Sequence, residues 1–376
     1  MDLTKQWTAA RRAVAIADLS ARRARLRVAG KHRTRFLHNL TSNDIAGLAV
    51  GTRCRATLLN PQGKLLADFH VYNRGDDLLV ECVAEAGEKL YGLFDRYIIA
   101  DDVELRLLQA AELPAWAALG PQAAAFVRDV LGATAPDGLA ELVGELPETR
   151  VLGGGATGAA GAFGEAGPAG AAGAADAAAA AGGAGAGERA PLVAGSRSVL
   201  GATGLLVLGT PPPLALAAAR SVMVLDDTTL EVLRLEGGVP RFGAEVDERL
   251  LPQEAALDAA LSFTKGCYVG QEAVAMLHYR GKLRRKMLGL VVEPGPAGEE
   301  GAAPVAGARV LVRGGDEDVG RVTSAVRLSP AFGRAVALAL LKLPAHEPGT
   351  MVDVELGDPS TPVRVAAAVQ ALPLVA

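Results

Sequence analysis

Cysteine and histidine are scarce in this chain, and their spacing excludes several kinds of site. The 376 residues include only three cysteines and five histidines. Cys54, Cys82 and Cys267 lie far apart without a CxxC pair, and no HExxH or HxxxH arrangement occurs. We therefore expect no zinc site and no bound metal. A scattered, odd set of cysteines is typical of a reducing cytoplasm rather than of a disulfide framework.

The sequence also lacks the motifs and long apolar runs of other common classes. Neither GxGxxG after an expected strand nor GxxxxGK[ST] occurs, which disfavours Rossmann and nucleotide-triphosphate enzymes. No run approaches the roughly 18 apolar residues of a spanning helix, and residues 1–12 contain no signal-peptide core. We expect a cytoplasmic protein without a membrane partner. The net charge of −4 argues against bulk electrostatic binding of nucleic acid, and no DNA partner is expected.

Glycine and alanine, by contrast, are abundant and mark one boundary. Apolar residues make up 50% of the chain but aromatic residues only 4%. Residues 153–187 are almost entirely Gly and Ala, with too little apolar bulk to offset the entropy lost on ordering. We predict a disordered insertion over residues 151–190 in a chain of two or three domains.

The flanking segments predict an α+β fold with a separate β-domain at the C-terminal end. Alternating strand and helix patterns before the insertion indicate a sheet with helices on one face, and residues 60–63 read as a hairpin turn. After residue 286, short β-type runs between Gly, Pro and Asp indicate an antiparallel barrel or sandwich. The expected C-terminal strands are residues 287–292, 309–312, 319–328, 335–341, 351–356 and 363–369.

The most informative run is KGCYVGQE at residues 265–272. It places Cys267 between Gly266 and Gly270, a pattern of a tight turn that a ligand can approach. A helix beginning near residue 269, together with Lys265, would favour the thiolate of Cys267. The alternative is a buried, inert cysteine in a strand-to-helix turn.

Two cationic features each have two interpretations. Residues 280–286 read RGKLRRK, which indicates either a solvated strand edge or a surface that receives an anionic cofactor tail or RNA. Arg234, in the run LRLEGG at 233–238, either forms a surface pair at the end of a helix or binds a carboxylate bidentately.

Together these segments resemble the folate-binding aminomethyltransferase (GcvT) superfamily, and specifically its YgfZ branch. The resemblance covers nearly the whole chain apart from the insertion. Residues 265–272 match the KGCYxGQE signature of that branch at every specified position, and this signature is highly specific. The more moderate matches are FLHNLTSNDI at 36–45, NPQGK at 60–64, FDRY at 94–97, LRLEGG at 233–238 and YRG at 279–281.

The resemblance implies a multidomain ring around a folate pocket, with a discontinuous core and a C-terminal antiparallel β-barrel. The implied parts are a core in residues 1–150 and 191–285, the insertion at 151–190, and a barrel at 286–376. Tetrahydrofolate or a derivative is the implied cofactor, and the implied partners are iron–sulfur proteins or their assembly factors, including enzymes that modify tRNA. The implied cofactor-binding residues are Asn43, Arg234, Tyr268, Gln271, Glu272 and Arg280.

One departure from the transferases affects the expected reaction. The glycine-cleavage enzymes carry an aspartate after a Glu-Lys pair, and here Leu90 follows Glu88-Lys89, with Asp95 the nearest later acid. Leucine neither accepts a proton nor stabilises a cationic intermediate. We therefore expect Cys267 to be the reactive group, aided by Lys265, in a folate-dependent step that supports iron–sulfur proteins. The alternatives are an ordinary aminomethyltransferase and an RNA-associated adaptor that uses the basic run at 280–286.

Overall fold

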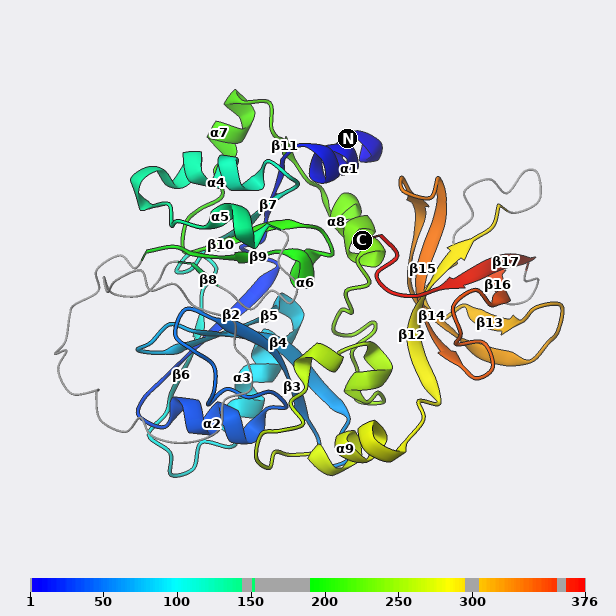
Figure 1. Ribbon diagram of the computed structural model, residues 1–376, viewed down its shortest axis with the longest axis horizontal. Helices are drawn as coiled ribbons and strands as arrows, with labels where there is room; N and C mark the ends of the chain where they lie inside the picture. The colour runs from blue at the N-terminus through cyan, green and yellow to red at the C-terminus, as the bar shows by residue number, and fades with distance from the viewer. Residues whose placement is uncertain (1, 144–150, 153–189, 295–303, 357–362, 376) are drawn as a thin grey trace.

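Two β-sheets with attached helices and a closed β-barrel make up the protein (Figure 1). The structure is a computed structural model that describes residues 2–143, 151–152, 190–294, 304–356 and 363–375. Of the predicted insertion, residues 153–189 lie outside the described residues.

The five-stranded sheet carries the polar surface that matters most for the site. Its antiparallel order is β3-β4-β5-β2-β6. Phe69 and its alternate neighbours pack on one face against α2 (Arg33–Leu40) and α3 (Gly87–Asp95), as the expected sheet with helices on one face requires. The strands are β2 (Arg23–Ala29), β3 (Arg53–Leu59), β4 (Leu65–Asn73), β5 (Leu78–Val83) and β6 (Glu104–Leu108).

The opposite face of this sheet is polar because the residues between the apolar positions are charged. Arg25, Arg53 and Glu81 are all buried there, and Tyr72 donates a hydrogen bond of 2.6 Å to Glu81. Burial raises the pKa of Tyr72, and the neighbouring carboxylate of Glu81 adds to the rise. Glu81 is paired with Arg23 at 3.1 Å, which offsets part of the cost of removing its charge from water.

The six-stranded sheet has the order β11-β1-β7-β10-β9-β8, with only the β1–β11 pair parallel among these strands. Its central strands are almost fully buried on both faces. The strands are β1 (Ala15–Asp18), β7 (Ala115–Leu119), β8 (Val151–Leu152), β9 (Leu192–Gly195), β10 (Gly204–Leu208) and β11 (Met223–Val224). The helices nearby are α1 (Leu3–Arg12), α4 (Ala123–Leu131), α5 (Leu139–Leu142), α6 (Arg197–Leu200) and α7 (Leu214–Ala219).

The C-terminal region is a closed antiparallel barrel, which confirms the predicted β-domain. Strands occur at all six predicted places, in the barrel order β12-β15-β14-β13-β16-β17. Alternate valines and leucines fill its interior. The strands are β12 (Arg285–Val292), β13 (Arg309–Val312), β14 (Asp318–Ser329), β15 (Arg334–Lys342), β16 (Met351–Leu356) and β17 (Val363–Gln370).

Helix α8 (Asp227–Glu236) lies between the six-stranded sheet and the barrel, and α9 (Gln271–Arg280) leads into the barrel (Figure 1). The buried carboxylate of Glu236 accepts hydrogen bonds from Trp7 and Arg11 of α1 and from Ser329 of β14. One carboxylate therefore ties the N-terminal helix to the barrel. The short 3₁₀ helices are Ala84–Ala86, Gly132–Thr134, Pro252–Ala255 and Asp258–Ala260. Among the described residues, no helix has the length and apolar character needed to cross a membrane.

Candidate functional site

Cys267 is exposed on the loop that precedes α9. The loop is fixed at Gly270, which has φ +79° and caps α9. A Cβ atom at Gly270 would lie 2.4 Å from the carbonyl oxygen of Asn60 and 2.9 Å from Cα of Gly63. Only glycine fits against the β3–β4 turn here, whereas a Cβ atom at Gly266 would meet nothing within 4 Å. The expected tight turn thus depends on Gly270 and not on Gly266.

Lys265 anchors the start of the cysteine loop. Its ammonium group donates hydrogen bonds to the carbonyl oxygens of His38, Thr41 (2.6 Å) and Asn43 (3.0 Å). His38 lies in the last turn of α2, where backbone carbonyls lack partners within the helix and favour a cation. Burial lowers the pKa of Lys265 to about 8, and the nearby Asp44 opposes that change.

This geometry corrects the expected means of activating the thiol. The helix begins at Gln271, four residues after Cys267, rather than near residue 269. Lys265 uses its three N–H groups on backbone carbonyls. Lys265 therefore positions the loop, on which Cys267 is exposed.

The other residues predicted around the motif fall into two groups. Tyr268 is buried with its ring 5.0 Å from Lys265 Nζ, and Asn43 binds Lys265 through its carbonyl, so these three lie together. The Tyr268 hydroxyl has no hydrogen-bond partner among the described residues, and burial raises its pKa to about 12. Gln271 and Glu272 begin α9, whereas Arg280 ends it and is exposed, a helix length away from the loop.

Arg234 lies elsewhere, in a cavity of about 680 Å³ that we call the central cavity. The cavity forms where β2, α6, α8 and β14 meet, and it is lined by Arg23, Val199, Glu231, Arg234 and Val326 among others. Residues from the five-stranded sheet, from the helices near the six-stranded sheet and from the barrel therefore line one cavity. A smaller hollow of about 70 Å³ shares Arg23, Arg234 and Arg241 with it.

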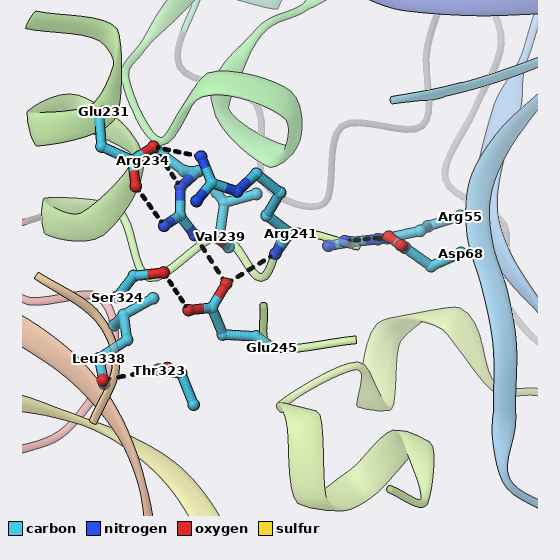
Figure 2. Close-up of polar contacts among 10 residues, drawn as sticks. All are labelled: Arg55, Asp68, Glu231, Arg234, Val239, Arg241, Glu245, Thr323, Ser324 and Leu338. Carbon is cyan, nitrogen blue, oxygen red and sulfur yellow. Dashed lines mark hydrogen bonds and ion pairs between the residues drawn. The ribbon is translucent and has the colours of Figure 1, made fainter. Parts of the chain in front are cut away.

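The charges of the central cavity are held in a network around Arg234 (Figure 2). Arg234 donates to both oxygens of Glu231 at 2.9 and 2.7 Å, and to Glu245 at 3.0 Å. Glu245 also accepts from Ser324 of the barrel at 2.6 Å. Burial alone would raise the pKa of Glu231, but Arg234 and Arg241 outweigh burial and lower it. Arg234 thus fixes two carboxylates, and its three nitrogens all have partners within the protein.

A second polar group lines the smaller hollow. Arg55 donates to Asp68 at 2.5 Å (Figure 2), and Nε2 of His70 lies 3.1 Å from the Ser198 hydroxyl. Burial, followed by the charge of Arg53, lowers the pKa of His70 well below its usual value. His70 is therefore neutral at pH 7 and presents one hydrogen-bond donor and one acceptor.

Leu90 is the residue that the resemblance to the transferases leads us to expect at the place of their aspartate. Leu90 is fully buried in the core between α3 and the five-stranded sheet. Asp95, the nearest later acid, is exposed at the end of α3. No cluster of three or more metal-binding side chains occurs among the described residues.

Comparison with protein families matches both ends of the chain. The GCVT N-terminal domain matches residues 2–139, and the glycine cleavage T-protein C-terminal barrel domain matches residues 285–374. The chain belongs to the glycine cleavage T-protein superfamily. Several relatives found by sequence are aminomethyltransferases, and the alignments span about a third of the length of some of them.

Three relatives illustrate the range of similarity. The chain is 35% identical over 138 residues to an aminomethyltransferase of Saccharopolyspora erythraea, covering 36% of this chain and 35% of the relative. It is 26% identical over 364 residues to the mitochondrial aminomethyltransferase of Saccharomyces cerevisiae, covering 90% and 79%. The solved glycine cleavage aminomethyltransferase T of Bartonella henselae shares the fold, with a TM-score of 0.73, 21% identity and coverage of 99% and 89%.

The partners of Arg234 were not predicted from the sequence. Glu231 lies three residues before Arg234 on one helix, and that spacing is a recognisable sign of an ion pair. Arg241 and Glu245 carry no such sign because their contacts depend on the loop after α8. His70 lies within a strand, and its contact with Ser198, 128 residues away, has no local sequence sign.

Proposed function

We propose that this chain is a tetrahydrofolate-binding protein of the YgfZ branch that supports iron–sulfur cluster assembly or repair, including that of enzymes that modify tRNA. One contrast carries the proposal. Cys267 is exposed on a loop anchored by Lys265 and Gly270, whereas Leu90 replaces the transferase acid with a buried apolar side chain. The reactive group has therefore moved from α3 to the loop before α9.

The central cavity has a donor set that suits tetrahydrofolate. A pterin presents a guanidine-like edge that pairs with a carboxylate, and the glutamate tail presents carboxylates that pair with arginine. Glu231 supplies the first kind of group, while Arg22 and Arg241, which are about half exposed at the rim, supply the second. The volume of about 680 Å³ lies within the usual range for sites that bind such molecules.

In this proposal each residue has a defined task. Arg234 holds Glu231 and Glu245 in place, and Arg241 binds the anionic tail. Tetrahydrofolate, when bound, supplies a carrier for one-carbon units. Cys267 supplies a nucleophilic thiol on the surface, where a protein partner can approach it.

Binding and complementation measured together test the proposal. Purified protein should bind tetrahydrofolate, and Arg241→Ala should weaken binding by about tenfold because a charge-assisted pair is lost. In a strain that lacks this protein, wild type should restore iron–sulfur enzyme activity and Cys267→Ser should not. Absence of folate binding, or full restoration by Cys267→Ser, would refute the proposal.

An ordinary aminomethyltransferase is the second candidate, because relatives of that name match the chain. The buried Leu90 argues against it. Transfer of the aminomethyl carbon from a lipoyl carrier protein to tetrahydrofolate at a rate typical of an enzyme would establish this candidate instead.

A further inference from the structure

A second cavity, of about 650 Å³, lies beside α9, between the last turn of that helix and the β3–β4 turn. We call it the basic groove. Its walls come from the end of α9, the link to β12, the β3–β4 turn and the end of β15. None of the residues of the central cavity lines it.

The charges of the basic groove are strongly unequal. Five cationic side chains line it, namely Lys64, Lys282, Arg284, Arg285 and Lys342, against the single carboxylate of Glu254. Glu254 is already bound by Arg285 at 2.9 Å and lies 3.8 Å from Lys64. Lys282 and Arg284 are exposed and have no ion-pair partner within the part of the chain that the structure describes. The groove therefore presents uncompensated positive charge to an approaching partner.

The remaining lining residues are leucines rather than aromatic residues. Leu251, Leu277, Leu283 and Leu343 line the groove, and Leu343 is 54% exposed. Single-stranded nucleic acid is usually held by aromatic rings on which bases stack, and no aromatic ring is found among the described residues that line this groove. Leucines beside cations instead suit a peptide that carries both carboxylates and apolar side chains.

We propose that the basic groove binds an acidic, leucine-bearing segment of a client protein. One wall of the groove, at Lys64, follows Gly63, which packs against Gly270, three residues after Cys267. A short extended stretch of a bound segment would therefore span from this wall to the thiol. The groove thereby brings the client within reach of the thiol. This inference rests on the proposed function, because it names the partner on which Cys267 acts.

Fluorescence polarisation with a defined probe tests the groove. The probe is a fluorescein-labelled peptide of alternating glutamate and leucine, about ten residues long. We expect the double variant Lys282→Glu/Arg284→Glu to weaken binding by about tenfold or more, with wild-type affinity falling as salt is added. The matched control Arg12→Glu/Arg128→Glu reverses two exposed arginines on α1 and α4 and should leave binding unchanged.

Comparison probes separate the possible occupants. A peptide in which serine replaces leucine, and an oligouridylate of similar length, should both bind at least about tenfold more weakly than the glutamate–leucine peptide. Leu283→Ser should also weaken binding of that peptide, which covers the case in which the double variant fails to fold. Equal binding of oligouridylate or of the serine peptide, or unchanged binding by both groove variants, would overturn the inference. Because no folate is present, such a failure leaves the folate proposal standing.

Discussion

The central cavity and the cysteine loop solve opposite physical problems. At the cavity, Arg234 and the adjoining Glu245 are buried, Glu231 is 26% exposed, and each charge is neutralised by a neighbour. On the loop, Cys267 is exposed, while the backbone beneath it is fixed by Lys265 and Gly270. In the proposed function, binding and reaction are therefore separated: rigid pairing would serve recognition of a ligand, and exposure on a rigid loop would serve reaction.

The largest expected effect comes from removing the thiol. Cys267→Ser should abolish restoration of iron–sulfur enzyme activity, because a hydroxyl is a far weaker nucleophile at neutral pH than a thiolate. Cys54→Ser is the matched control, since burial raises the pKa of the Cys54 thiol to about 12 and leaves it unreactive. If Cys54→Ser failed as completely as Cys267→Ser, the loss would not be specific to the exposed thiol of Cys267.

The next largest effect should come from breaking the cavity network. Arg234→Met leaves the buried carboxylate of Glu245 without its cation and leaves Glu231 with Arg241 alone, which should cost about 3–5 kcal/mol of unfolding free energy. Arg241→Met removes a guanidinium that is 44% exposed and should cost about 1 kcal/mol or less. Urea unfolding of both variants measures the difference. Equal losses would show that burial does not distinguish the two arginines.

Thiol labelling sharpens the contrast between the three cysteines. Burial raises the pKa of both Cys54 and Cys82 to about 12, so only roughly one part in 10⁴ of each is thiolate at pH 8. Iodoacetamide should therefore modify Cys267 at least about 100-fold faster than either in the folded protein. Peptide mass mapping over time reads the three rates, and comparable rates would show that exposure does not set Cys267 apart.

The smallest expected effect is the pH dependence due to Lys265. Its pKa is lowered to about 8 in the folded protein from an ordinary 10.5. Between these values the unfolded chain retains a proton that the folded protein has released, so this group makes stability rise with pH. Between pH 8 and 10, the unfolding free energy of wild type should rise relative to that of Lys265→Met by less than about 1 kcal/mol, because partial exposure screens the effect. A constant difference in urea midpoint would show that Lys265 keeps its ordinary pKa.

The sequence predicted the barrel better than the six-stranded sheet, for a physical reason. The barrel strands alternate apolar and polar residues between turn formers, and each pairs with neighbours in the same region. By contrast β1 (Ala15–Asp18) and β7 (Ala115–Leu119) are short, alanine-rich and buried almost throughout, so they show no alternation. They also pair across about a hundred residues of chain, which no local pattern reports.

The candidate site shows the same difference between local patterns and long-range contacts. The KGCYVGQE run identified Cys267 because it is a local signature. The contacts of Lys265 with α2 span more than 200 residues, and Arg234 meets Glu245 only because the loop after α8 folds back. Local patterns therefore revealed which residues matter, whereas their partners depend on the tertiary fold.

Calorimetric titration of tetrahydrofolate into three proteins tests the separation of binding from reaction most directly. Wild type and Cys267→Ser should bind with the same affinity within about twofold, and Arg241→Ala should bind about tenfold more weakly. If Cys267→Ser lost binding while Arg241→Ala kept it, the ligand would lie at the cysteine loop, and the separation of binding from reaction would be contradicted.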